Sequence, residues 1–316
     1  MQNVWIIGAG GMAQDYINVL KSLEVDFSVI GRSLESSKSC EKASKCQVVT
    51  GGLESFLSKN PRSCSHAIVA VGIENLYETT KQLLEYGIKK ILVEKPGGLY
   101  LSEFKELIEL SAKKDSKVFI AYNRRFYASV IEAQKIIAED GGVKSFNFEF
   151  TEWAHVIEPL KKADGVKEKW FLGNSTHVVD LAFFLGAKPK EISSFTSSDL
   201  DWHPSASNFS GAGISESGAL FNYQANWKSA GRWSVELLTN EHRLIFRPME
   251  KLYIQKRGTI AQTLVESIDY SLDDEYKPGL FVQTEKFIRD DFSNMCSLEE
   301  QYKAMDIYNK MANYKS

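Results

Sequence analysis

Cysteine is scarce in this sequence, with 4 residues among 316, and no two of them form a CxxC pair. So few thiols exclude a disulfide scaffold, and their spacing is not that of a zinc or dithiol redox site. No cluster of His, Cys and carboxylate residues has metal-ligand spacing either. We therefore expect reduced thiols, a cytoplasmic location and no metal site.

An excess of one charge is also lacking, because 41 acidic residues against 38 basic ones leave a net charge of −3. This balance indicates no basic face for nucleic acid. The apolar runs, such as residues 67–71 and 181–185, are much shorter than the roughly 20 residues of a membrane-spanning helix. The first residues lack the basic start and apolar stretch of a secretory signal. Neither nucleic acid nor a membrane is an expected partner.

What is present is the composition of an ordinary globular protein, with 43% apolar and 25% charged residues. Over residues 1–121, short β-branched runs alternate with amphipathic helical stretches, which is typical of a parallel sheet with helical crossovers. This pattern predicts an N-terminal α/β domain of the Rossmann type with a doubly wound parallel sheet. The expected strands are residues 4–7, 27–30, 47–49, 67–71, 91–93 and 118–121.

From residue 122 onward the expected strands follow one another directly. Phe146, Phe148 and Phe150 alternate with polar residues, which indicates a strand with one face in water. We predict a second α+β domain, 122–316, with a large, mostly antiparallel sheet that serves substrate binding and oligomerisation. Further strands are expected at 219–227, 232–239, 243–247 and 251–255, and helices at 127–139, 177–185 and 298–314.

A glycine-rich turn stands directly after the first expected strand and before a helix. Its residues fit the pattern G-x-G-x-x-A, in which the first glycine permits a tight turn, the second admits a pyrophosphate and the small last residue allows close packing. The helix N-terminus would offer N–H groups to the anion. The cofactor-binding residues predicted here are Gly8, Gly10, Gly11, Met12 and Ala13.

The end of the second expected strand should select the dinucleotide. An acidic residue there would bind the ribose 2′-hydroxyl of NAD, but the nearby acid, Asp26, stands at the other end of the strand. Arg32 and Ser33 follow the strand instead and suit a 2′-phosphate. We expect NADP as the cofactor and leave NAD open, since Arg32 can also be read as an ordinary solvated arginine.

Three further motifs complete the pattern. Glu94-Lys95-Pro96 ends the fifth strand, Tyr122-Asn123-Arg124-Arg125-Phe126 stands at the domain junction, and His177-Val178-Val179-Asp180-Leu181 is followed by Gly186. With the glycine turn, these motifs resemble those of the glucose-fructose oxidoreductase, inositol dehydrogenase and MocA (Gfo/Idh/MocA) family over nearly the whole chain. The resemblance implies a Rossmann domain followed by an α/β domain with a large, mostly antiparallel sheet.

The resemblance implies that Lys95 and His177 are catalytic, beside the nicotinamide and the reacting carbon of a sugar. Hydride transfer from an alcohol carbon needs a group that moves the hydroxyl proton and one that stabilises charge on oxygen, which suit histidine and lysine. Further cofactor contacts are expected from Val71, Glu94 and Lys95. Substrate contacts are expected from Asn123, Arg124, Trp153, His155, Asn174 and His177. For His155, packing in the core is an equally open interpretation, and one of Arg124 and Arg125 can instead be a solvated residue between the domains.

Two departures from the family pattern stand out. Gly173 occupies the place where many members have an Asp four residues before the histidine, and Asn174 follows it. Asn174 cannot accept a proton as Asp could, so proton handling falls on His177 and Lys95. Residues 71–76 also lack the Pro and the His often found in that loop.

These patterns predict an NAD(P)-dependent oxidoreductase that transfers hydride between nicotinamide and a hydroxyl or keto carbon of a sugar, cyclitol or nucleotide sugar. The alternative is a non-catalytic, NADP-responsive binding or regulatory protein on the same scaffold. The partner is a small, sugar-like substrate. We also expect a homo-oligomer joined through the second sheet, because strand 219–227 has Leu220 on one face and Phe221, Tyr223 and Trp227 on the other.

Overall fold

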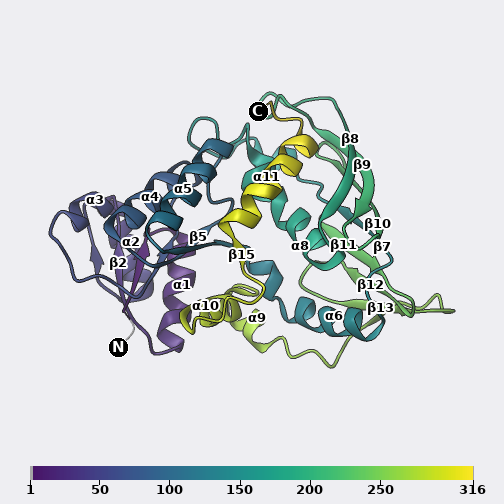
Figure 1. The fold of residues 1–316 in the computed structure, drawn as a ribbon, viewed down its shortest axis with the longest axis horizontal. Helices are drawn as coiled ribbons and strands as arrows, with labels where there is room; N and C mark the ends of the chain where they lie inside the picture. Colours follow the sequence, from purple (N-terminus) through teal and green to yellow (C-terminus); the bar gives the residue numbers. More distant parts are fainter. Residues whose placement is uncertain (1–2, 316) are drawn as a thin grey trace. The chain divides into compact units, whose positions relative to one another are not determined.

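A computed structural model of the protein describes residues 3–315 (Figure 1). Met1, Gln2 and Ser316, which the predicted domain ranges include, lie outside the described residues. The chain forms two compact units. One contains the described residues up to Asn123 together with Leu272–Ala304, and the other contains Arg124–Ser271 together with the described residues from Met305 onward. The division falls within helix α11 (Leu298–Ala312).

The first unit is built on one sheet, which has seven strands within residues 3–315, in the order β15-β6-β5-β4-β1-β2-β3. All neighbours are parallel except β15 and β6. The run 6-5-4-1-2-3 is the doubly wound Rossmann order, in which the winding reverses between β1 and β4. The predicted fold class is thus confirmed. The strands are β1 (Asn3–Ile7), β2 (Asp26–Ile30), β3 (Val48–Val49), β4 (His66–Val69), β5 (Lys90–Glu94), β6 (Lys117–Ala121) and β15 (Cys296–Ser297).

Helices of the first unit follow the apolar spacing of the sequence. Leu76, Thr80, Leu83 and Leu84 are fully buried along one face of a single helix, as the 3.6-residue period predicts. The sheet buries almost every side chain of its central strands, which explains their continuous β-branched runs. The helices are α1 (Gly11–Ser22), α2 (Leu34–Ser44), α3 (Gly52–Leu57), α4 (Leu76–Tyr86), α5 (Leu101–Lys113), α9 (Ser271–Glu275) and α10 (Leu280–Ile288).

The segment Leu272–Ala304 packs with the first unit, whereas the sequence analysis assigned every residue after 121 to the second domain. Strand β15 pairs with β6, which adds an antiparallel strand to the parallel sheet. Asp290 joins the segment to two strands, since its carboxylate is 3.0 Å from Nε2 of His66 and 2.6 Å from Nζ of Lys90. These contacts cross more than 170 residues of sequence, so local periodicity does not reveal them.

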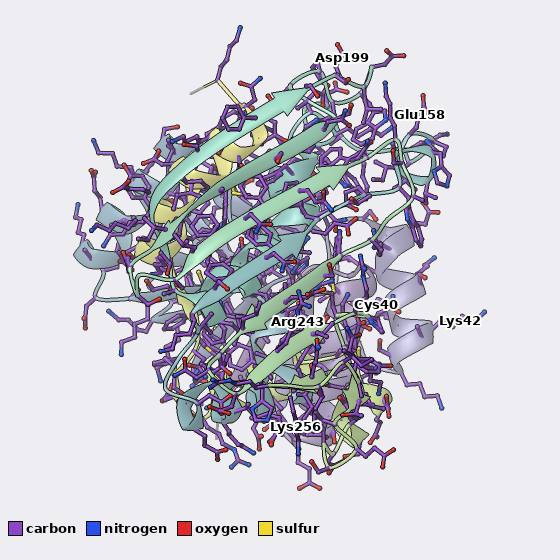
Figure 2. The ribbon with its side chains drawn as sticks, turned by 90° about the vertical axis from the view of Figure 1, so that its right-hand side faces the viewer. Cys40, Lys42, Glu158, Asp199, Arg243 and Lys256 are labelled. Atoms are coloured by element: carbon purple, nitrogen blue, oxygen red, sulfur yellow. The ribbon has the colours of Figure 1, made fainter. Side chains whose placement is uncertain are left out.

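The second unit is built on a sheet with eight strands within the described residues, in the order β14-β13-β12-β11-β7-β10-β9-β8. Neighbours are antiparallel except β7 and β10. Figure 2 shows these strands side by side, with Arg243 on β12 and Lys256 on β13. They are β7 (Ser145–Glu149), β8 (Pro189–Ser197), β9 (Asn208–Ser215), β10 (Leu220–Asn226), β11 (Ser234–Leu238), β12 (His242–Phe246), β13 (Tyr253–Lys256) and β14 (Thr263–Leu264).

An aromatic cluster fills the buried face of this sheet. Phe183 contacts the rings of Phe146, Phe148 and Phe221 at centroid distances of 6.2, 5.5 and 5.3 Å. Phe183 belongs to the helix that begins one residue before His177, so the aromatic packing fixes that helix across β7 and β10. The helices of this unit are α6 (Ala128–Glu139), α7 (Ala154–Ile157) and α8 (Thr176–Gly186).

Strands β8, β9 and β14 were not expected from the sequence. Strand β9 reads Asn-Phe-Ser-Gly-Ala-Gly-Ile-Ser, and its glycines are typical of a loop. In the structure a Cβ atom on Gly211 would lie 2.4 Å from the ring of Tyr223, so the glycine makes room for a neighbouring aromatic side chain. No helix within residues 3–315 is both long and apolar enough to cross a membrane.

Candidate functional site: a dinucleotide turn and a substrate cluster

The predicted phosphate-binding turn joins β1 to α1 in the first unit. Gly8 has a φ of +128°, and a Cβ atom there would lie 2.2 Å from the carbonyl oxygen of Ala70. A side chain at Gly8 is therefore excluded, both by the backbone conformation and by the chain that follows β4. The backbone nitrogen of Val71 is 3.4 Å from the same Cβ position. Gly8 and Val71 thus meet where the strand order reverses, which is where open α/β sheets bind ligands.

The turn fits a dinucleotide. Helix α1 begins at Gly11, and its N-cap, Gly10, makes no side-chain hydrogen bond. Cβ atoms on Gly10 and Gly11 would meet nothing within 4 Å, so the space beside the helix N-terminus is open within the described residues. Ala13 is fully buried, as close packing of helix on strand requires. Free N–H groups beside open space are what a pyrophosphate needs.

Arg32 and Ser33 lie between β2 and α2. Both side chains are exposed. Ser33 is the N-cap of α2, because its Oγ accepts a hydrogen bond from the backbone nitrogen of Ser36 at 3.2 Å. No ion pair of Arg32 is found within residues 3–315, so its guanidinium is available to an external anion. Asp26 is exposed at the start of β2, the opposite end of the strand, as expected.

Glu94 and Lys95 stand at the carboxyl end of β5. The hydroxyl of Tyr16, on α1, donates a hydrogen bond to Oε1 of Glu94 at 2.8 Å, which ties this strand end to the helix of the phosphate turn. Burial raises the pKa of Glu94, while Tyr16 and Lys95 act to lower it. Burial beside this carboxylate raises the pKa of Tyr16 well above its usual value. The Glu94 carboxylate thus lies among Tyr16, Lys95 and the turn.

Lys277 is a residue of this region that sequence reasoning did not find. Its Nζ lies 2.9 Å from Sδ of Met12 and 3.9 Å from Oδ2 of Asp15. Met12 belongs to the phosphate turn, so the structure places a lysine of the C-terminal segment against that turn. The two residues are 265 positions apart, and nothing in the local sequence around Lys277 signals the contact.

In the second unit, a buried ion pair holds two of the predicted motifs together. Nε of Arg125 donates to Oδ2 of Asp180 at 2.8 Å, and NH2 of the same arginine contacts Oδ1. Both side chains are only 4% exposed. Asp180 is the acidic residue of the H-x-x-D motif, so the pair fixes α8, the helix of His177, to the Arg124-Arg125 segment.

His177 is the second residue of α8. A π-helical turn, Phe171–Ser175, precedes the helix, and the hydroxyl of Thr176 donates to the carbonyl of Leu172 at 2.8 Å. π-helical turns of this kind occur often at functional sites. The imidazole of His177 lies beside Trp233, with ring centroids 6.3 Å apart.

Glu152 is the carboxylate that accompanies Asn174, and it was not among the predicted site residues. Its Oε1 accepts hydrogen bonds from Nδ2 of Asn174 and Oγ of Ser175, each at 2.9 Å, and its Oε2 is 3.2 Å from Arg232. Burial raises the pKa of Glu152, and these three partners oppose the shift. The sequence lacks an acid at position 173, but the carboxylate of Glu152, 21 residues earlier in the sequence, contacts Asn174.

The remaining predicted substrate residues differ in where they lie. Arg124 lies over Trp233, at 4.8 Å from the ring centroid. Trp153 is 45% exposed, and Arg232 lies over its ring at 4.8 Å. His155 is exposed on α7. Asn123 is buried in the first unit. Its Nδ2 donates a hydrogen bond to the carbonyl of Pro278 at 2.8 Å, so its side chain is bound to the backbone of the same unit.

The second unit therefore brings Arg124, Asn174 and His177 into one cluster together with Glu152, Arg232 and Trp233. We call these six residues the Trp233 cluster. Lys95 and the dinucleotide turn belong to the first unit. Among the described residues no group of three or more His, Cys, Asp or Glu side chains is placed to hold a metal ion.

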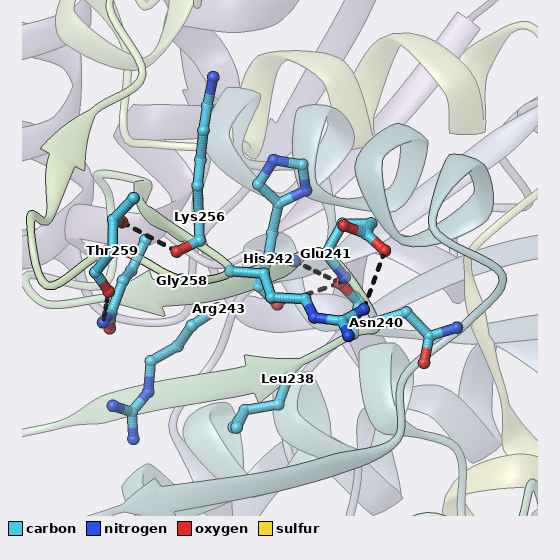
Figure 3. A pocket seen from close by; sticks show the side chains of 11 residues that line it. Leu238, Asn240, Glu241, His242, Arg243, Lys256, Gly258 and Thr259 are labelled. Carbon is cyan, nitrogen blue, oxygen red and sulfur yellow. Dashed lines mark hydrogen bonds and ion pairs between the residues drawn. The ribbon is translucent and has the colours of Figure 1, made fainter.

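A hollow at the ends of β11, β12 and β13 contains none of the predicted site residues (Figure 3). It is rich in basic side chains, and several of these have acidic partners: Nε of Arg243 is 2.9 Å from Glu236, and Nδ1 of His242 is 2.9 Å from Asp140. Arg257 is 3.5 Å from Glu241. Lys256 lines the same hollow, and no ion pair of its ammonium group is found within residues 3–315.

The strand order and the glycine turn define the first unit as a dinucleotide-binding Rossmann domain. Residues 2–122 match the GFO_IDH_MocA family, described as an oxidoreductase family with an NAD-binding Rossmann fold. This match over the N-terminal domain confirms the resemblance seen in the sequence, and the predicted class of NAD(P)-dependent oxidoreductase agrees with it. No curated protein matches the sequence.

Solved structures share the fold over the whole chain. A dehydrogenase (MviM) from Clostridium difficile is 22% identical, with a TM-score of 0.79 and 99% of each chain covered. UDP-N-acetylglucosamine 3-dehydrogenase GnnA from Acidithiobacillus ferrooxidans is 12% identical, with a TM-score of 0.76, covering 99% of this chain and 97% of its own. Levoglucosan dehydrogenase in complex with NADH and L-sorbose is 16% identical, with a TM-score of 0.79 and the same coverage.

Proposed function

We propose that this protein is an NADP-dependent oxidoreductase that transfers hydride between the nicotinamide and a hydroxyl or keto carbon of a sugar, cyclitol or nucleotide sugar. The observation that carries the proposal is the open glycine turn on the same sheet edge as Glu94 and Lys95. The family of the N-terminal domain supports the redox class. The sugar dehydrogenases among the similar structures support the substrate class.

The residues that would hold the dinucleotide are those of the first unit. The backbone of residues 8–13 would receive the pyrophosphate, and Val71 and Glu94 would contact the cofactor at the neighbouring strand ends. Lys277, against Met12, would add a positive charge on the phosphate side. A bound nicotinamide supplies the hydride acceptor or donor.

NADP is the dinucleotide that the residues after β2 favour. Arg32 is exposed without an ion pair in the described chain, and Ser33 offers a hydroxyl beside it. A guanidinium and a hydroxyl suit the oxygens of a 2′-phosphate, and the three residues that directly follow β2, Gly31, Arg32 and Ser33, include no acid to bind a 2′-hydroxyl.

Lys95 and His177 would carry the proton and charge chemistry. As an alcohol is oxidised, the carbon loses hydride and the hydroxyl loses a proton, so a base must take that proton. His177 would accept the proton and return it in the reverse reaction. The ammonium of Lys95 would stabilise the negative charge that develops on the same oxygen. This assignment requires both side chains to reach one substrate.

The cofactor preference is tested by calorimetry with the substitution Arg32→Asp. We expect the unmodified protein to bind NADP more tightly than NAD. The variant should lose about tenfold or more in NADP affinity, because a carboxylate repels the 2′-phosphate, and should gain relative affinity for NAD. Arg62→Asp, at another exposed arginine of the first unit, is the matched control and should bind both as the unmodified protein does. Tighter binding of NAD than of NADP by the unmodified protein would contradict the proposal.

The alternative function is that of a non-catalytic, NADP-responsive binding protein. The absence of an acid at position 173 is the feature that favours it. It predicts a conformational response to NADP, detectable by tryptophan fluorescence, that His177→Ala leaves intact, together with no turnover of any sugar. Turnover of one sugar by the unmodified protein decides for the enzyme.

Self-association through the second sheet is also proposed. Phe221, Tyr223 and Trp227 are buried within the chain, so the apolar face that motivated the prediction is already covered. On the opposite face Leu220 is 64% exposed and Phe195 is 69% exposed. Light scattering coupled to size-exclusion chromatography tests the proposal, and a monomer would remove it.

A further inference from the structure

Arg124 has a cationic head without a protein counter-ion. Its Nε is buried and has no hydrogen-bond partner, and no ion pair of its guanidinium is found within residues 3–315. The guanidinium lies over two aromatic rings, at 4.8 Å from Trp233 and 5.9 Å from Tyr127. Burial lowers the pKa of Arg124, but an arginine keeps its charge in proteins.

The neighbouring carboxylates are committed to other groups. Glu152 accepts its hydrogen bonds from Asn174, Ser175 and Arg232. Asp180 is bound through both oxygens to Arg125, the residue next to Arg124. Glu250 and Glu152 act on Arg124 through space, and neither a hydrogen bond nor an ion pair within residues 3–315 joins either of them to it.

The Trp233 cluster therefore holds one positive charge in excess. Arg124 and Arg232 both lie over Trp233, at 4.8 and 4.4 Å, and Glu152 is the carboxylate that balances one of them. Stacking on an aromatic face holds the planar guanidinium in place while its terminal N–H groups can still donate. A fixed, partly dehydrated guanidinium edge is suited to two parallel hydrogen bonds with an oxyanion.

We propose that Arg124 binds an oxyanion on the substrate, so that the sugar carries a carboxylate or a phosphoryl group. This inference rests on the proposed function and narrows its substrate class from sugars in general to anionic sugars. The location supports it, because the ring that carries Arg124 also lies beside His177, at 6.3 Å between centroids. The anion would be held about one aromatic ring away from the group that moves the proton.

Arg124 and Arg125 show why the assignment is specific. The two are adjacent in the sequence, and either could have been the anion-binding residue. The carboxylate of Asp180 neutralises the charge of Arg125 inside the protein, so the charge of Arg125 is not available to a ligand. Arg124 has the same donors and no such acid.

The test uses matched neutral and anionic sugars with the full-length protein and NADP or NADPH. Glucose and myo-inositol are the neutral probes, glucuronate carries a carboxylate, and glucose 6-phosphate and UDP-glucose carry phosphoryl groups. Turnover is followed at the nicotinamide absorbance, and sugar binding to the NADP-loaded protein by calorimetry. We expect binding and turnover of a sugar in one of the two anionic groups, and the group that responds distinguishes carboxylate from phosphoryl recognition.

Substitutions of Arg124 then test whether this residue binds the anion. Arg124→Met keeps the apolar stem and removes the charge, so affinity for the anionic sugar should fall about ten- to a hundredfold, with NADP affinity unchanged. Arg124→Lys keeps the charge without the planar fork and should lose less. Arg257→Met, at an exposed arginine of the same unit, is the control and should behave as the unmodified protein.

Two results would overturn the inference while leaving the proposed function in place: turnover of neutral sugars alone, or equal affinity of Arg124→Met and the unmodified protein for an anionic sugar. Absence of binding and turnover with every sugar and either cofactor would instead contradict the proposed function, and the anion site would fall with it.

Discussion

The cofactor half of the proposed function, in the first unit, and the substrate half, in the second unit, are built in different ways. The cofactor half depends on backbone: a positive φ at Gly8 that excludes a side chain, open space at Gly10 and Gly11, and strand ends on one edge of one sheet. The substrate half depends on side chains brought together from distant segments, with Trp233 at the centre of contacts to Arg124, Arg232 and His177. A binding site formed by the backbone of one turn can be recognised from a local sequence motif. A binding site formed by side chains from distant segments has no such motif, because each segment contributes a single residue.

Because the two halves lie in different units, we expect a substitution in one half to impair its function without impairing the other. The largest effect is expected for His177→Ala, which should lower kcat by roughly a hundred- to ten-thousandfold, the usual range for loss of a general acid or base. The affinity for NADP should be nearly unchanged, because the phosphate turn lies in the other unit. Steady-state kinetics on an identified substrate and calorimetry with NADP measure the two effects. His242→Ala, a histidine of the same unit outside the Trp233 cluster, should keep its kcat; a loss of NADP affinity equal to the loss of kcat in His177→Ala would refute the separation.

The two adjacent arginines of the second unit are expected to differ in their effect on stability. Arg125→Met leaves the buried carboxylate of Asp180 without its partner and should cost about 3–5 kcal/mol of stability. Arg124→Met removes a cation that has no ion pair and should cost far less. Urea unfolding followed by tryptophan fluorescence reports mainly on this unit, which contains five of the six tryptophans. Equal losses in the two variants would contradict the assignment of Arg125 to structure and Arg124 to ligand.

Acid should weaken the second unit through His203. Burial lowers the pKa of His203 to about 4, and its ring contacts the carbonyl of Ala206 at 2.6 Å and the hydroxyl of Tyr314 at 2.7 Å. The unfolded chain takes up a proton near pH 6.5, while the folded protein does so only near pH 4, so the stabilisation is complete above pH 6.5 and is lost as the pH falls between these values.

The slope from this group reaches about 1.4 kcal/mol per pH unit, or on the order of 3 kcal/mol across the range. Urea unfolding between pH 7 and about pH 4.5 measures it. His203→Gln should flatten this part of the profile, and His155→Gln, at an exposed histidine, should not. An unchanged slope in His203→Gln would show that another group is responsible.

A smaller loss of turnover than in His177→Ala is expected on substitution of Lys95, which follows β5 in the first unit. Lys95→Met keeps most of the apolar stem and deletes the ammonium, so turnover should fall about a hundredfold or more. NADP affinity should change much less, because the phosphate turn remains intact. Turnover close to that of the unmodified protein would make Lys95 a structural residue and leave the proton and charge chemistry to His177.

Sequence reasoning recovered the parts of the fold that are locally encoded. The six parallel strands and the glycine turn follow from β-branched runs and from a motif in its proper context, and the structure confirms them. Strand β9 was missed because Gly211 makes room for the ring of Tyr223, which only the neighbouring strand explains. The segment Leu272–Ala304 was assigned to the other domain, since its contacts with His66 and Met12 cross the length of the chain.

Within the site, the same limit applies. Arg124, Asn174 and His177 were expected from motifs, but the residues that hold them, Glu152 and Arg232 among them, carry no local signature. Glu152 could have been suspected only from its being a carboxylate at the end of an alternating strand, next to Trp153. The roles of all these residues stay predictions until a substrate is known.

Hydride transfer between a dinucleotide and a sugar is the proposed activity of this chain. The most direct measurement is the nicotinamide absorbance of the unmodified protein mixed with NADP or NADPH and a panel of sugars, cyclitols and nucleotide sugars. We expect a time-dependent change in absorbance with at least one anionic sugar, larger with NADP or NADPH than with NAD or NADH at equal concentration. No change with any member of the panel, from protein that binds NADP tightly by calorimetry, would contradict the claim.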